Sequence, residues 1–123
     1  MTLEGTVKSG MGEAKYWMEK AEKILENKLK MKMYHGTLNV TLKDEYKIQD
    51  ERNIIKGSEY GGTQNLYIDK CVVFEDKAFI IRTEKNESGN GDHPLNIVEI
   101  ISNINFREKY NLKDGDKVEI KID

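Results

Sequence analysis

Many of the apolar residues in this chain fall in short segments where apolar and polar side chains alternate. The clearest is His35–Leu42, HGTLNVTL, in which Leu38, Val40 and Leu42 fall on one face of an extended strand. A short strand with one apolar face must bury that face against other strands or a helix. The pattern therefore predicts a mainly β chain. Further strands are expected at Leu3–Ser9, Leu66–Phe74, Lys77–Arg82, Ile97–Ile101 and Val118–Ile122, with a weaker one at Asn53–Lys56.

One long helix interrupts these strands. The segment Tyr16–Leu29, YWMEKAEKILENKL, places Trp17, Ala21, Ile24 and Leu25 on one stripe. Only a short turn or helix is expected later, at Phe106–Tyr110. Because strands and helices do not alternate, a small β-barrel is favoured over a doubly wound parallel sheet.

Two connections stand out between the expected strands. Leu66–Phe74 and Lys77–Arg82 read as a hairpin around Glu75 and Asp76. After the hairpin, Thr83–Asn96, TEKNESGNGDHPLN, is a polar loop that carries the only proline. A connection of this length often marks a binding element.

Length and composition limit the class of protein. With 123 residues, a net charge of −2 and a pI near 5.8, the chain is one domain without the basic surface of a nucleic-acid or anionic-membrane binder. No apolar run is long enough to span a bilayer, and no secretory signal precedes the first strand. Cys71 lies in an apolar run and is interpreted as a buried small hydrophobe. We therefore expect a cytoplasmic protein without disulfides.

A glycine-containing turn follows the first expected strand, in the segment GMGEAK at residues 10–15. Two glycines one residue apart let the backbone approach a ligand closely and direct N–H groups toward an anion, and Lys15 can add a positive charge. An ordinary turn relieved by glycine explains the same residues. Neither of the two common nucleotide-binding loop motifs is complete anywhere in the chain.

The polar face of His35–Leu42 carries short side chains with oxygen atoms. Thr37 and Asn39 lie two residues apart and offer oxygens to a hard cation such as Mg²⁺. Because both side chains are neutral, most of the negative charge at such a site must come from the ligand. A nucleoside polyphosphate that carries the ion fits this requirement. A solvated strand face is the alternative interpretation.

Several other residues are candidates for chemistry. Glu99 is a carboxylate within the apolar segment NIVEIIS, where it can orient or deprotonate a hydroxyl, or simply face outward. His93 and His35 are interpreted as loop residues, and His93 can touch a ligand. Arg107 can pair with a phosphate or remain solvated.

Three segments, taken in order, resemble the archaeal CTP-dependent riboflavin kinases. They are EGTVKSGMGEAKY at 4–16, YHGTLNVTL at 34–42 and VEIISNINFREKYNLKDGDKVEI at 98–120. The similarity covers most of the chain, and residues 43–88 are less diagnostic. The resemblance implies a six-stranded cradle-loop β-barrel with one main helix, in a single domain spanning 1–123. No N-terminal helix-turn-helix domain of the kind some relatives carry is expected.

The resemblance also implies an activity and a set of site residues. It implies a kinase that transfers the γ-phosphoryl group of CTP to the 5′-hydroxyl of riboflavin, giving FMN and CDP, as a monomer without nucleic-acid or membrane partners. Thr37 and Asn39 are then the Mg²⁺ ligands, and Glu99 is the catalytic residue and a flavin contact. Gly91 stands where relatives place a flavin-contacting threonine, with Ser88 as a possible substitute. The nucleotide-binding residues are Gly10, Met11, Gly12, Glu13, Ala14, Lys15, Ile104, Asn105, Phe106 and Arg107.

Two other classes of protein explain part of the sequence. Small barrels that end in a strand similar to DGDKVEI include swapped-hairpin transcription regulators, which bind DNA as dimers. That alternative explains the C-terminal strand and leaves GMGEAKY and HGTLNV unexplained. A flavin or nucleotide carrier without turnover is the third possibility.

Overall fold

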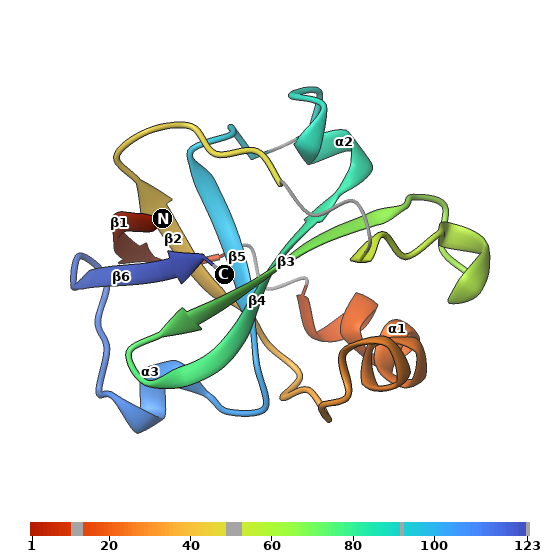
Figure 1. Ribbon diagram of the computed structural model, residues 1–123, viewed down its shortest axis with the longest axis horizontal. Helices are drawn as coiled ribbons and strands as arrows, with labels where there is room; N and C mark the ends of the chain where they lie inside the picture. Colours follow the sequence, from red (N-terminus) through yellow and green to blue (C-terminus); the bar gives the residue numbers. More distant parts are fainter. Residues whose placement is uncertain (11–13, 49–52, 92, 123) are drawn as a thin grey trace.

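Six antiparallel strands close into a barrel in the order β1-β2-β5-β4-β3-β6 (Figure 1). The structure is a computed structural model that describes residues 1–10, 14–48, 53–91 and 93–122. The predicted small β-barrel with one main helix is confirmed. The elements are β1 (Thr2–Lys8), α1 (Ala14–Leu29), β2 (Leu38–Leu42), η2 (Gly57–Glu59), β3 (Leu66–Val73), β4 (Asp76–Thr83), α2 (Glu84–Glu87), β5 (Ile97–Ile101), α3 (Phe106–Lys109) and β6 (Lys117–Ile122).

Two segments differ from the sequence-based expectation. Asn53–Lys56 is not a strand, because only Ile55 forms a bridge, to Leu66, before the chain turns into η2. The polar loop after β4 begins with one helical turn, α2, which was not expected. Thr83 caps that turn, since its Oγ1 accepts a hydrogen bond from the backbone N–H of Asn86 at 3.3 Å.

The inside of the barrel is an apolar core. Leu38, Val40 and Leu42 point into it, as their alternation in the sequence predicts. Cys71 belongs to the same core and is 2% exposed, in agreement with its interpretation as a small buried hydrophobe. Burying a leucine or valine side chain completely contributes about 1.5–3 kcal/mol to the free energy of folding.

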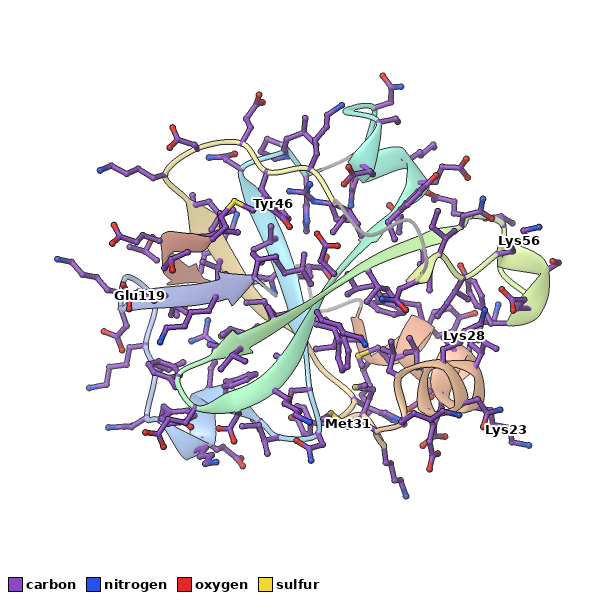
Figure 2. All side chains as sticks on the ribbon, in the orientation of Figure 1. Lys23, Lys28, Met31, Tyr46, Lys56 and Glu119 are labelled. Carbon is purple, nitrogen blue, oxygen red and sulfur yellow. The ribbon has the colours of Figure 1, made fainter. Side chains whose placement is uncertain are left out.

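A second apolar core lies outside the barrel, where α1 packs against the sheet. Met18, Ala21 and Leu25 of the helix meet strand residues that include Ile81 and Ile101. In Figure 1, α1 lies to one side of β3 and β4, and Figure 2 shows Lys23 extending from the helix away from the barrel. The helix thus covers part of the outer surface of β4 and β5. Strand β2, the neighbour of β5, lies beside this covered part.

A buried arginine fastens three connections at one mouth of the barrel. Arg82 of β4 donates hydrogen bonds to the backbone oxygens of Tyr46, Leu95 and Ile97, and it pairs with Glu87 of α2 at 3.1 Å. The Tyr46 hydroxyl, among the packed side chains in Figure 2, donates to Asp69. Burial raises the pKa of Tyr46 well above its ordinary value. The network fixes the start of the loop that leads from α2 to β5.

Candidate functional site

Asn39 and Glu99 lie side by side on the outer face of the barrel. They are register partners of the antiparallel pair β2–β5, and Lys8 of β1 is the partner of Asn39 on the other side. The alternation that turns Leu38 and Val40 inward turns Asn39 outward. Asn39 is nevertheless only 7% exposed, whereas Thr37 and Thr41 on the same face are half-buried.

The two predicted metal ligands are in contact. Asn39 Nδ2 donates a hydrogen bond to Thr37 Oγ1 at 3.3 Å. Within the described residues, no group of three or more His, Cys, Asp or Glu side chains is gathered to hold a metal ion. Thr37 and Asn39 supply only neutral oxygens, and such a donor set fits Mg²⁺ when phosphate oxygens and waters complete its coordination.

The chain after β1 passes directly over Asn39. A Cβ atom at Gly10 would lie 2.4 Å from Asn39 Nδ2, so only glycine permits this approach. Met11, Gly12 and Glu13 of the predicted nucleotide loop lie outside the described residues. The helix α1 begins at Ala14, and Lys15 in its first turn is exposed. Within the described residues, Gly10 thus lies against Asn39, one of the two predicted metal ligands, and α1 begins at Ala14.

The second predicted nucleotide segment meets Thr37 in one cavity. Ile104, Asn105, Phe106 and Arg107 line a cavity of about 170 Å³ together with Thr37. The cavity is completed by Tyr34, Gly36, Leu38 and Ile100. Asn105 caps α3 and donates from Nδ2 to the hydroxyl of Tyr34 at 3.0 Å. Phe106 is buried in the barrel core, so we expect its backbone to be the part that faces a ligand.

Arg107 joins this segment to the end of β1. Its Nη2 donates to the backbone oxygen of Lys8 at 3.1 Å and to Asp114 Oδ1 at 2.6 Å. The Ser9 hydroxyl donates to the other carboxylate oxygen of Asp114, also at 2.6 Å. The Ser9 hydrogen bond, and next the Arg107 hydrogen bond, lower the pKa of Asp114 below its ordinary value. The second predicted nucleotide segment is thus tied through one carboxylate to Ser9, the residue before Gly10.

Glu99 faces a separate, smaller cavity of about 30 Å³. His93 Nδ1 lies 3.4 Å from Glu99 Oε1, and their side chains are 16% and 22% exposed. The small volume admits about one water molecule or one polar group of a ligand, and no ring system. The remaining lining residues are Trp17, Leu66, Ile81, Arg82, Thr83, Asn86 and Ile97.

Gly91 and Ser88, the two loop residues predicted to contact the flavin, do not line the Glu99 cavity. Ser88 is exposed, and its hydroxyl donates to the backbone oxygen of Lys85 at 2.9 Å. Asn86 does line the cavity, although the sequence pattern does not single it out. No local signal identifies it, because its position depends on the α2 turn.

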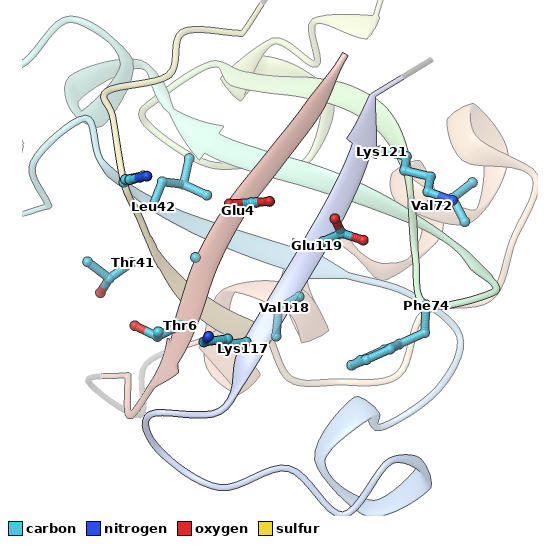
Figure 3. Close-up of a pocket in the computed structure, with 12 residues that line it drawn as sticks. Glu4, Thr6, Thr41, Leu42, Val72, Phe74, Lys117, Val118, Glu119 and Lys121 are labelled. Atoms are coloured by element: carbon cyan, nitrogen blue, oxygen red, sulfur yellow. The ribbon is translucent and has the colours of Figure 1, made fainter.

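A hollow larger than these two cavities lies elsewhere on the barrel. It measures about 810 Å³ and is lined by residues of β1, β2, β3 and β6 and of the turns that follow β2 and β3 (Figure 3). Its two carboxylates, Glu4 and Glu119, are cross-strand partners in the β1–β6 pair. None of the residues singled out in the sequence as site residues lines it. Size alone therefore does not identify the functional site of this barrel.

Comparison with known proteins identifies the relatives of this chain. Residues 7–122 match a family model named CTP-dep_RFKase and described as a domain of unknown function, DUF120. The chain is 33% identical over 132 residues to the riboflavin kinase of Methanobrevibacter smithii, covering 99% of this chain and 100% of that protein. It is 32% identical over 127 residues to the riboflavin kinase of Methanococcoides burtonii, covering 98% of this chain and 56% of the relative.

A third similar protein is the riboflavin kinase of Methanocella arvoryzae, 29% identical over 126 residues, with 98% of this chain and 56% of that protein covered. The chain thus spans little more than half the length of several relatives that it matches. Within the described residues, no helix combines the length and apolar character needed to cross a lipid bilayer. From the matched segments and the closed barrel, we conclude that the chain belongs to the archaeal CTP-dependent riboflavin kinase family.

Proposed function

We propose that this protein transfers the γ-phosphoryl group of CTP to the 5′-hydroxyl of riboflavin, giving FMN and CDP. The observation that carries the proposal is the cross-strand pair of Asn39 and Glu99, where Glu99 lines one cavity and Thr37, the contact of Asn39, lines another. The relatives are named riboflavin kinases, and the family name supplies CTP as the donor. Membership in this family favours the kinase over the DNA-binding alternative.

The nucleotide is assigned to the side of the pair where Gly10, Thr37 and α3 meet. At Gly10 the backbone passes close to Asn39 without a side chain in the way. The N-terminus of α1 carries the positive end of the helix dipole, which favours the negative charge of phosphates. We assign recognition of the cytosine base to backbone groups of 104–107, because backbone donors and acceptors are fixed in position.

Thr37 and Asn39 are the residues that would hold Mg²⁺ together with the phosphates of the nucleotide. The ion supplies neutralisation of the charge on the transferring phosphoryl oxygens. Asn39 is held for this role by its position in the middle of a paired strand and by its contact with Thr37. A buried, immobilised amide loses little side-chain entropy when it binds a ligand.

In the proposed reaction the 5′-oxygen of riboflavin attacks the γ-phosphorus of CTP. The bond between that phosphorus and the bridging oxygen breaks, and CDP leaves with the electron pair. The proton of the hydroxyl passes to the carboxylate of Glu99, which His93 holds in place. Phosphoryl transfer of this kind depends mainly on in-line positioning and charge neutralisation, so no covalent enzyme intermediate is needed.

The proposal is tested by incubating the protein with riboflavin, Mg²⁺ and either CTP or ATP, followed by chromatographic detection of FMN. We expect FMN with CTP, little FMN with ATP, and no FMN when Mg²⁺ is removed with a chelator. Equal FMN formation with ATP would contradict the assignment of CTP. No FMN with any nucleotide, together with tight binding of duplex DNA, would contradict the kinase assignment itself.

A further inference from the structure

The connection from β4 to β5 begins with α2, and in it the side chain of Asn86 fills the space next to Gly91. A Cβ atom placed on Gly91 would lie 1.8 Å from Asn86 Oδ1 and 2.8 Å from Asn86 Cγ. The carboxamide of Asn86 therefore occupies the space that a side chain at position 91 would fill. Gly91 is required here because of this close approach.

Asn86 is held firmly in that position. Its backbone N–H donates to the capping hydroxyl of Thr83, and its Oδ1 accepts from the backbone N–H of His93 at 3.3 Å. Accepting from an N–H fixes which end of the amide is oxygen. Within the described part of the chain, we find no hydrogen-bond acceptor for Asn86 Nδ2. Two N–H donors thus remain for a ligand.

The carboxamide is also placed beside Glu99. Asn86, His93 and Glu99 line the same small cavity, and His93 is bonded to both of the others. A cavity of about 30 Å³ places a polar group that enters it within reach of several of its lining side chains. The donors of Asn86 and the acceptors of Glu99 then offer complementary partners for one polar group of a substrate.

We propose that Asn86 binds the flavin substrate, through a hydrogen bond donated by Nδ2 beside Glu99. The inference rests on the proposed function, because that function brings the 5′-hydroxyl of riboflavin to Glu99, which lines this cavity. It makes Asn86 a substrate contact in place of position 91, which carries no side chain, and of Ser88, whose hydroxyl is bonded to Lys85.

The test is a titration of riboflavin fluorescence with purified protein, which measures binding independently of turnover. Asn86→Ala is expected to weaken riboflavin binding about tenfold and to leave the KM for CTP unchanged. Asn86→Asp keeps an oxygen that accepts from the His93 N–H and loses the donors of Nδ2. It should therefore weaken riboflavin binding similarly while the melting temperature stays close to that of the wild type.

Matched variants separate a direct contact of Asn86 with riboflavin from a role of Asn86 in anchoring the loop. Ser88→Ala, on the same connection, should bind riboflavin as the wild type does. Gly91→Thr alone should be impaired by the clash with Asn86. The double variant Asn86→Ala/Gly91→Thr should recover part of the lost affinity, since one contact of 2.9 Å to the backbone nitrogen of Asn86 remains.

The outcomes distinguish the inference from the proposed function. Wild-type affinity for riboflavin in both Asn86→Ala and Asn86→Asp would overturn the inference alone. Normal binding of riboflavin without any FMN formation would overturn the kinase assignment and leave the inference in place. No binding of riboflavin by the wild-type protein would overturn both.

Discussion

At the scale of single residues, the carboxylate of Glu99 interrupts an apolar part of the outer face of the sheet. Glu99 is the register partner of Ile81 on β4 and lies two residues before Ile101 on β5, and both isoleucines pack under α1. A carboxylate in such a position is stabilised only by specific partners, here His93 at 3.4 Å. Placing Glu99 here costs free energy of folding, and it provides a carboxylate that can take part in the reaction.

Replacing Glu99 tests whether its carboxylate takes part in the reaction. Glu99→Gln keeps the size and the hydrogen-bonding shape of the side chain but removes its ability to accept a proton at neutral pH. We expect kcat for FMN formation to fall by about 10²- to 10⁴-fold, with smaller changes in the KM values for both substrates. Steady-state kinetics measures the split.

Glu119→Gln is the matched control, because Glu119 is exposed on β6 and lies in the hollow of Figure 3. It should retain the wild-type rate. Wild-type turnover in Glu99→Gln would remove Glu99 from the chemistry.

The sequence predicts some of these residues better than others. Alternation in HGTLNVTL predicts that Asn39 faces away from Leu38 and Val40, and the structure agrees. Asn86 could not be found in this way. Its position depends on the turn capped by Thr83 and on the close approach of Gly91. Neither contact leaves a periodic pattern in the sequence.

At the scale of elements, a buried charged side chain helps to fix the connections between strands. Arg82 joins β4 to α2 through Glu87, and to the segment after β2 and the start of β5 through backbone oxygens. Its side chain is 3% exposed. Removing one partner of a buried ion pair leaves the other charge without compensation.

Arg82→Met is therefore expected to lower the free energy of unfolding by roughly 3–5 kcal/mol. Urea denaturation followed by circular dichroism measures the change. Lys77→Met on the same strand is the control, since Lys77 is exposed, and its effect should stay within about 0.5 kcal/mol. A loss below about 1 kcal/mol in Arg82→Met would show that the network is not a principal anchor of the loop.

A second clamp, at Asp114, makes a prediction about pH. The hydrogen bonds from Ser9 and Arg107 lower the pKa of Asp114, so the charged form is favoured in the folded protein. The contribution of this clamp is fully present above the ordinary aspartate pKa, about 3.9, and is lost only as the pH falls through the lowered value. The clamp should remain intact between about pH 5 and 8.

Carboxyl chemical shifts measured by nuclear magnetic resonance during an acid titration test this expectation. The Asp114 signal should titrate below the ordinary aspartate value, and Ser9→Ala should shift its midpoint upward. A midpoint at or above the ordinary value in the wild-type protein would mean that the clamp does not form in solution.

At the scale of the whole molecule, the six barrel strands and the long helix follow from the sequence, and their arrangement does not. Short alternating strands with a single long helix predict a small β-barrel. The order β1-β2-β5-β4-β3-β6 depends on pairings between residues far apart in the chain, such as Asn39 with Glu99, which local periodicity does not encode. The position of α1 outside the barrel has the same origin.

Asn53–Lys56 is a segment where the local sequence pattern predicts a strand that the structure does not have. Its residues are compatible with a strand, but the chain turns into η2 after a single bridge between Ile55 and Leu66. Tertiary context therefore decides against a local preference that is weak.

The central claim is that the nucleotide and its metal ion meet the flavin at the start of β2, where Asn39 and the preceding Thr37 lie. The most direct measurement is the rate of FMN formation as a function of Mg²⁺ concentration in Asn39→Ala and Thr41→Ala. Both positions lie on the outward-facing side of β2, but Thr41 lines the hollow of Figure 3 and not the site cavities. We predict that Asn39→Ala loses most turnover and Thr41→Ala stays close to the wild type. Wild-type rates in Asn39→Ala at limiting Mg²⁺ would contradict the account.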